Sequence, residues 1–168
     1  MKISSDELTL LERIISNPMI TQVKLAEETG VSSEMLKPNG MILCYPVITS
    51  GEFAHRSSFE KLLGDKYEEL VDKMSLEKQV NENTPQAFIW HTFTDDCVPV
   101  QNSLLLIDAM VKNNIPAEFH MYPSGGHGLG LANKCTANPG GYGIQKECAS
   151  WTELLRKWLE SNYPIETI

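Results

Sequence analysis

Two side chains in this sequence are of the types that pair in acid–histidine catalysis, and each follows an apolar run of strand length. Asp95 stands in Thr94-Asp-Asp-Cys-Val-Pro99, and His127 stands in Tyr122-Pro-Ser-Gly-Gly-His-Gly128. A carboxylate that accepts the Nδ1 proton of a histidine fixes the tautomer of the ring and stabilises the imidazolium. We therefore predict that Asp95 and His127 are the acid and the base of a Ser–His–Asp triad.

The serine of such a triad is not found by its usual motif. A strained strand-to-helix turn of the pattern Gly-x-Ser-x-Gly normally presents it, and this pattern does not occur before Asp95. Ser57 and Ser58 are the only substitutes, and they lack flanking glycines and a preceding strand. Because loss of the nucleophile leaves a small fraction of the rate, we expect this chain alone to be inactive.

Both residues also have explanations that need no catalysis. Asp95 and Asp96 can cap a helix that begins near Val100, and a histidine in a surface loop is commonly solvated. The glycines on both sides of His127 favour catalysis, since they permit unusual backbone angles and close approach of the ring to the acid.

Other reactive side chains show no spacing that defines a site. No Cys-x-x-Cys pair occurs, which predicts reduced thiols for the four cysteines, Cys44, Cys97, Cys135 and Cys148. Cys97 has acidic neighbours that disfavour a thiolate, so we interpret it as structural. We expect no metal and no cofactor, because no ligand spacing links the remaining histidines, His55, His91 and His120. His55 is expected in a surface loop.

From residue 41 onward, apolar runs of strand length alternate with helical patterns. The expected strands are 41–47, 87–93 and 117–122, and the expected helices are 100–113 and 145–161, with short helical pieces around 59–63, 65–74 and 76–80. This alternation predicts parallel strands joined by crossover helices. Three strands leave an exposed sheet edge, so we expect a homo-oligomer formed through that edge.

Residues 1–36 form a second expected segment, separate from residues 37–168, with helices at 4–16 and 21–28. Residues 8–35 resemble a bacterial helix-turn-helix through Leu25-Ala-x-x-x-Gly-Val-Ser32. Three basic and six acidic residues in this segment argue against binding to nucleic acid. DNA binding or regulation therefore stays an alternative to the interpretation of this segment as a helical cap for the sheet.

Three stretches, 36–48, 90–103 and 119–128, carry a resemblance to a known family. They resemble the C-terminal half of α/β-hydrolase superfamily carboxylesterases of the acetyl-esterase and xylan-esterase type, related to dienelactone hydrolases and prolyl-oligopeptidase catalytic domains. The resemblance implies a partial three-layer α/β sandwich with a mostly parallel sheet. It also implies Asp95 as the acid in preference to Asp96, His127 as the base, and small acyl esters or acetylated sugars as substrates.

Charge and hydropathy exclude several classes of partner. Lys and Arg number 14 and Asp and Glu 22, so the net charge of −8 argues against nucleic acid or an anionic membrane as the main partner. No stretch approaches the about 18 apolar residues of a membrane span. The first residues lack the apolar core of a signal peptide, so we expect the chain in the cytoplasm.

Overall fold

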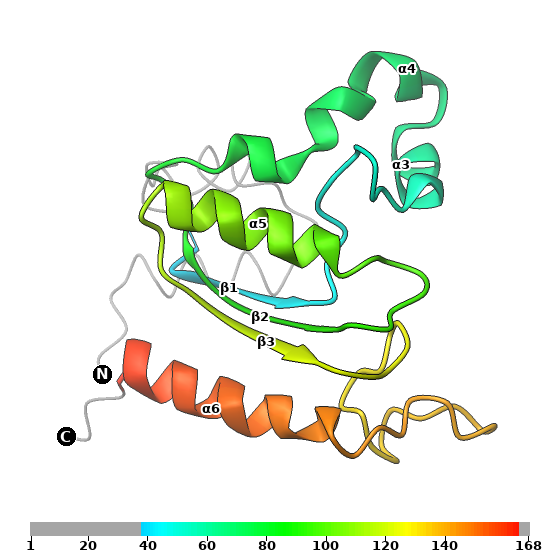
Figure 1. The fold of residues 1–168 in the computed structure, drawn as a ribbon, viewed down its shortest axis with the longest axis vertical. Coiled ribbons are helices and arrows are strands. Elements are labelled where there is room, and N and C mark those ends of the chain that lie inside the picture. The colour runs from blue at the N-terminus through cyan, green and yellow to red at the C-terminus, as the bar shows by residue number, and fades with distance from the viewer. Residues whose placement is uncertain (1–37, 165–168) are drawn as a thin grey trace, which may run out of the picture. The chain divides into compact units, whose positions relative to one another are not determined.

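Three parallel strands lie at the centre of the computed structural model, which describes residues 38–164 (Figure 1). They are β1 (Gly40–Cys44), β2 (Gln86–Thr92) and β3 (Ala117–Tyr122), in the order β1-β2-β3, with β2 paired to both neighbours. The predicted parallel sheet is therefore confirmed. The expected helices at 4–16 and 21–28 and the helix-turn-helix-like segment 8–35 lie outside the described residues.

The first strand is shorter than the sequence predicted, since it ends at Cys44 instead of Val47. Tyr45 takes a positive φ of 40°, and its N–H donates to the carbonyl of Trp90 at 2.8 Å. Pro46 follows without an N–H group to continue the ladder. The chain thus turns away from the sheet at Tyr45, although the apolar run continues.

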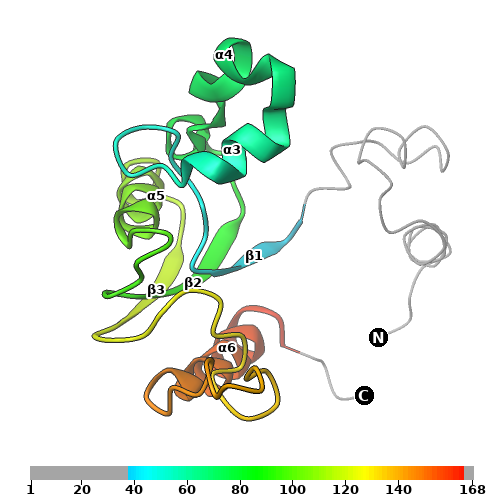
Figure 2. The ribbon, with the colours of Figure 1, turned by 90° about the vertical axis from the view of Figure 1, so that its right-hand side faces the viewer.

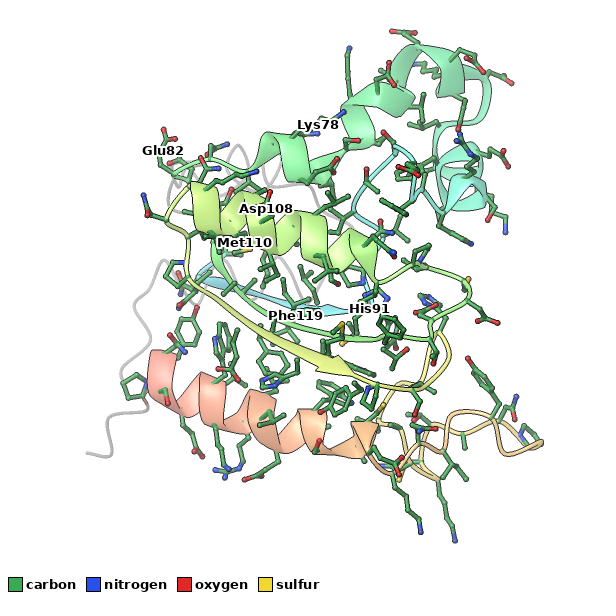
Figure 3. The ribbon with its side chains drawn as sticks, in the orientation of Figure 1. Lys78, Glu82, His91, Asp108, Met110 and Phe119 are labelled. Carbon is green, nitrogen blue, oxygen red and sulfur yellow. The ribbon has the colours of Figure 1, made fainter. Side chains whose placement is uncertain are left out.

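The middle strand is buried on both faces, as its continuous apolar run predicted. On one face Ala87 and Ile89 pack with Leu106 and Met110 of helix α5 (Gln101–Lys112), and Figure 3 shows Met110 between this helix and the sheet. On the other face the ring of Trp90 stacks against Trp151 of helix α6 (Trp151–Asn162), at a centroid distance of 5.3 Å. Helices thus cover both faces (Figure 1).

The last helix begins later than expected, at Trp151 instead of Gln145. The N–H of Gln145 donates to the carbonyl of Ala132 at 3.0 Å, which holds this part of the chain against the preceding loop. A 3₁₀ turn, η5 (Cys148–Ser150), then leads into α6. The carbonyl of Gln145 accepts the N–H groups of Cys148 and Ala149 at 3.0 and 3.2 Å, so a short turn stands where the sequence predicted the start of the helix.

The long connection between β1 and β2 consists of short helical pieces, as predicted. They are α3 (Arg56–Leu63), η2 (Gly64–Lys66), α4 (Tyr67–Leu70), η3 (Val71–Met74) and η4 (Leu76–Gln79). Figure 2 shows α3 and α4 on the same side of the sheet as α5. None of the described helices is both long and apolar enough to cross a membrane.

Within the described part of the chain, β1 is an edge strand, and half of Ile42 is exposed there. Beside it lies an apolar groove of about 260 Å³, lined among others by Met41, Leu43 and Leu106. The expected homo-oligomer through this edge stays a prediction.

A buried asparagine connects the chain after β1 to the start of α5. The Oδ1 of Asn102 accepts the N–H groups of Ile48 and Thr49 at 2.9 and 3.0 Å. Its Nδ2 donates to the carbonyls of Phe53 and Pro99 at 2.9 and 3.0 Å. Every hydrogen-bonding position of this side chain is used, so one residue holds together the two loops that flank the candidate site.

We predict that Asn102→Ala lowers the free energy of unfolding by about 3 kcal/mol, because buried backbone groups lose their partners. Urea denaturation measures the loss. The matched control is Asn113→Ala, which removes an exposed bond to the carbonyl of Ala109 and should cost less than about 1 kcal/mol. Equal losses in the two variants would contradict the structural role of Asn102.

Candidate active site

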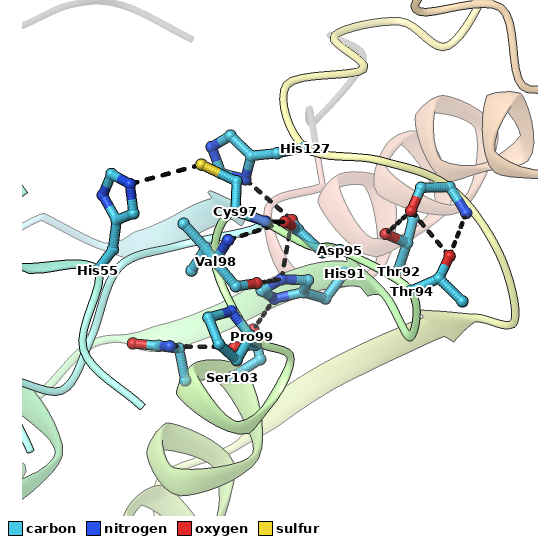
Figure 4. A network of polar contacts seen from close by, with 12 residues as sticks. His55, His91, Thr92, Thr94, Asp95, Cys97, Val98, Pro99, Ser103 and His127 are labelled. Carbon is cyan, nitrogen blue, oxygen red and sulfur yellow. Dashed lines mark hydrogen bonds and ion pairs between the residues drawn. The ribbon is translucent and has the colours of Figure 1, made fainter. Parts of the chain in front are cut away.

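Asp95 lies in the loop after β2, and its carboxylate is fully buried. Oδ1 accepts the backbone N–H groups of Cys97 and Val98 at 3.0 and 2.8 Å. Oδ2 lies 2.9 Å from Nδ1 of His127 and 3.3 Å from Nε2 of His91 (Figure 4). Four N–H groups thus converge on one carboxylate, which compensates for the hydration that it loses on burial.

This geometry decides against the interpretation of Asp95 as a helix cap. Helix α5 begins after Val100, and its N-cap position has no side-chain cap hydrogen bond within the described part of the chain. The carboxylate instead accepts the N–H groups that follow within its own loop. Asp95 organises this loop and orients His127.

His127 is carried by the loop that follows β3, and this loop is fastened to the end of β2. The hydroxyls of Thr92 and Thr94 donate to the carbonyl of Gly125 at 2.9 and 3.0 Å (Figure 4). The N–H of Gly125 donates in turn to the Thr94 hydroxyl at 2.9 Å. The two loops that carry the acid and the histidine are therefore joined before the side chains themselves meet.

The glycines beside His127 have two uses, of which the sequence suggested the first, an unusual backbone angle. Gly128 has a positive φ of 72°, which a residue with a side chain rarely adopts. A Cβ on Gly126 would collide with the hydroxyl of Tyr142. That hydroxyl donates to the carbonyl of His127, so the absence of a side chain at Gly126 allows the tyrosine to hold the loop.

Tyr45 contacts the ring of His127, and its role was not foreseen from the sequence. Its ring meets the imidazole edge to face at 4.8 Å between centroids, and its hydroxyl accepts the N–H of Gly130 at 3.2 Å. The signal available in the sequence was a polar aromatic residue followed by proline at the end of a buried strand. Tyr45 thus steadies the ring and the loop that carries it.

The hydrogen bond to Asp95 defines the tautomer of the neutral His127 ring. Its Nδ1–H donates to the carboxylate, so the neutral ring has its lone pair on Nε2. Among the described residues, nothing forms a hydrogen bond with Nε2. The side chain of His127 is 30% exposed and that of Asp95 is 0% exposed, so a reacting group can reach the histidine but not the acid.

His91, on β2, is a buried member of the site that the sequence did not single out. Its Nε2–H donates to the carbonyl of Val98 at 2.9 Å and also faces Asp95. Its Nδ1 accepts the hydroxyl of Ser103 on α5 at 2.8 Å. Burial lowers the pKa of His91 more than the Val98 carbonyl and Asp95 raise it, which favours a neutral ring. A histidine inside an otherwise apolar strand was the available signal.

We predict that the buried His91 makes stability depend on pH. Unfolded His91 has an ordinary pKa of 6.5 and binds a proton below it, while the folded residue, whose pKa is lowered, stays neutral. Stability should therefore fall as the pH drops below about 6.5, until the folded pKa is reached. Urea denaturation of the wild type and His91→Gln between about pH 5 and pH 8 measures this.

Near pH 8 His91 is neutral in both the folded and the unfolded wild type. The difference in unfolding free energy between wild type and variant then reports only the lost packing and hydrogen bonds of the substituted side chain. At lower pH the wild type should lose stability faster than the variant. A constant difference across the range would show that His91 does not titrate differently in the folded and unfolded states.

The two serines considered as substitutes for the nucleophile lie at the start of α3. The Ser57 hydroxyl is 3.2 Å from Nε2 of His55, and the Ser58 hydroxyl is 2.8 Å from Nδ1 of the same ring. In the described part of the chain, neither hydroxyl forms a hydrogen bond with His127. The structure therefore brings these serines to His55 and not to the acid–histidine pair.

The other reactive side chains considered from the sequence are His120 and the four cysteines. His120 is paired with Glu118 at 2.7 Å on β3. The cysteines are unbridged, and burial raises the pKa of Cys148 to about 11. Across residues 38–164, no three His, Cys, Asp or Glu side chains are grouped so as to hold a metal ion. Cys97, interpreted as structural, has an exposed thiol 3.5 Å from Nε2 of His55.

A carboxylate and a histidine joined at the carboxyl ends of neighbouring parallel strands, between helical layers, define the class of this protein. It is part of an α/β-hydrolase fold, which solved esterase and α/β-hydrolase structures share. The chain belongs to the prolyl oligopeptidase family, whose sequence model matches residues 46–138. The matched segment includes both Asp95 and His127.

Individual relatives agree with this placement. The chain is 47% identical over 98 residues to endo-1,4-beta-xylanase B of Butyrivibrio fibrisolvens, covering 58% of this chain and 15% of that protein. The acetyl ester-xyloside bifunctional hydrolase of Caldicellulosiruptor lactoaceticus is 42% identical, with a TM-score of 0.65, over 74% of this chain and 42% of that one.

A sugar hydrolase from Lactococcus lactis is 30% identical, with a TM-score of 0.70, over 93% of this chain and 67% of that one. The chain thus spans less than half the length of the xylanase and of the bifunctional hydrolase. The esterase ancestry predicted from the sequence is confirmed.

Proposed function

We propose that this chain supplies the acid and the base for hydrolysis of small acyl esters, with Asp95 as the acid and His127 as the base. The observation that carries the proposal is the 2.9 Å contact between Nδ1 of His127 and the buried carboxylate of Asp95. This contact leaves Nε2 of the histidine as the proton acceptor. The backbone amides of Cys97 and Val98 and the ring of His91 keep the carboxylate oriented.

The chemistry follows from these positions. A serine hydroxyl at Nε2 of His127 would lose its proton to the ring as its oxygen attacks the ester carbonyl. Asp95 would stabilise the imidazolium, which then returns the proton to the leaving alcohol. Water, activated by the same nitrogen, would release the acyl group and restore the serine.

The names of the relatives support a substrate class. One similar protein is an acetyl ester-xyloside bifunctional hydrolase and another is a sugar hydrolase. We infer that acetylated sugars are the substrates that this acid–histidine pair serves. The 30% exposure of His127 gives such an ester access to the base.

The proposal includes inactivity of these residues by themselves, because they contain no Gly-x-Ser-x-Gly motif. The purified chain should neither hydrolyse p-nitrophenyl acetate above its His127→Gln variant nor react with a fluorophosphonate probe, which labels activated serines. Intact-mass spectrometry reads the labelling. A covalent adduct on Ser57, Ser58 or any other serine would contradict this part of the proposal and identify an unrecognised nucleophile.

The acid assignment is tested by supplying the serine separately. The part of the Caldicellulosiruptor lactoaceticus hydrolase outside the segment that this chain covers is co-expressed with it, and acetyl release from acetylated xylose is measured. We expect activity in the mixture and a loss on the order of 10⁴-fold with Asp95→Asn. The neighbouring, exposed Asp96 provides the matched control, and Asp96→Asn should leave the activity within about twofold.

Equal losses in the two variants would show that the acid is assigned wrongly. A folded mixture without activity would show that the serine cannot be supplied by a second chain. These two outcomes are distinguishable, because only the first requires an active mixture.

A further inference from the structure

We propose that Cys97 and His55 form a reactive thiol–imidazole pair that takes up small thiols as mixed disulfides. The Sγ atom lies 3.5 Å from Nε2 of His55, as the dashed line in Figure 4 shows. The two residues are 42 positions apart, so only the fold brings them together. The pair stands beside the Asp95–His127 pair and is built from different side chains.

The imidazole is held in the orientation that such a pair needs. Nδ1 of His55 lies 2.8 Å from the hydroxyl of Ser58, and the hydroxyl of Ser57 lies 3.2 Å from Nε2. A proton on Nδ1 that is donated to Ser58 leaves Nε2 as an acceptor for the Ser57 hydroxyl and for the thiol. A nucleophile, a base and a group that orients the base are thus in sequence.

The thiol is also fixed and accessible. The N–H of Cys97 donates to Oδ1 of Asp95 at 3.0 Å, which anchors the backbone of the residue. The residue is exposed, so a small disulfide can reach its sulfur. Of its two acidic neighbours, Asp95 has its carboxylate occupied by four N–H donors, and Asp96 is exposed, so solvent and salt screen its charge.

The other three cysteines lack this combination. Burial raises the pKa of both Cys44 and Cys148, and that of Cys148 reaches about 11. Cys135 is exposed, and its described hydrogen bond is from its own N–H to Oδ1 of Asn133. Cys135 is therefore an internal reference, an exposed thiol with no imidazole partner among residues 38–164.

The reaction is a thiol–disulfide exchange. Cys97 transfers its proton to Nε2 of His55 while its sulfur attacks one sulfur of the small disulfide, whose S–S bond breaks. The leaving thiolate takes the proton from the imidazolium. One mixed disulfide on Cys97 and one free small thiol are formed, and the small disulfide is the only oxidant required.

The test is the rate at which each cysteine of the full chain reacts with oxidised glutathione near neutral pH, followed by peptide mass spectrometry. We expect Cys97 to react about tenfold faster than Cys135. His55→Gln should reduce the rate at Cys97 to that at Cys135. His120→Gln, which alters a histidine paired with Glu118, should leave the ratio unchanged.

Cys135 serves as the reference within each variant, since this exposed thiol should react at the same rate in every variant that folds. In concentrated urea the preference for Cys97 should disappear, because the pair exists only in the folded chain. Equal rates at Cys97 and Cys135 in the folded wild type would overturn the proposal. An unchanged preference for Cys97 in folded His55→Gln would overturn it equally, by showing that the imidazole has no part in the reaction.

Discussion

The carboxylate of Asp95 is the constraint on which the rest of the site depends. A charged group without exposed surface is costly unless hydrogen bonds replace its water, and here four N–H groups do so. Two of them belong to the loop itself, one to β2 and one to the loop after β3. Satisfying one carboxylate thus fixes the positions of three segments of the chain.

The sheet makes this convergence geometrically simple. Parallel strands end at the same edge, and the ends of β1, β2 and β3 deliver Tyr45, Asp95 and His127 in that order. The buried aromatic and aliphatic side chains of β2 set the plane from which these ends leave. Asn102 then closes the side of the site toward α5, where Ser103 of the same helix holds His91.

Local patterns predicted the strands, the parallel pairing and the two central residues of the site, because apolar runs and glycine-rich loops are properties of neighbouring residues. His91 and Asn102 could not be predicted in the same way, since their roles depend on groups that lie close only after folding. The differences at the end of β1 and the start of α6 are local. A positive φ at Tyr45 followed by Pro46 ends the strand, and the 3₁₀ turn η5 stands before the helix.

The acid–histidine pair is held in place by its own surroundings. Both oxygens of the Asp95 carboxylate have partners, and the loop of His127 is held by Thr92, Thr94 and Tyr142. The same hydrogen bonds would form whether or not a nucleophile were present. The pair's geometry therefore supports a role in proton transfer, but catalysis depends on a group that can reach Nε2 of His127. A nucleophile supplied to this chain would therefore have to lie within hydrogen-bond distance of Nε2 of His127.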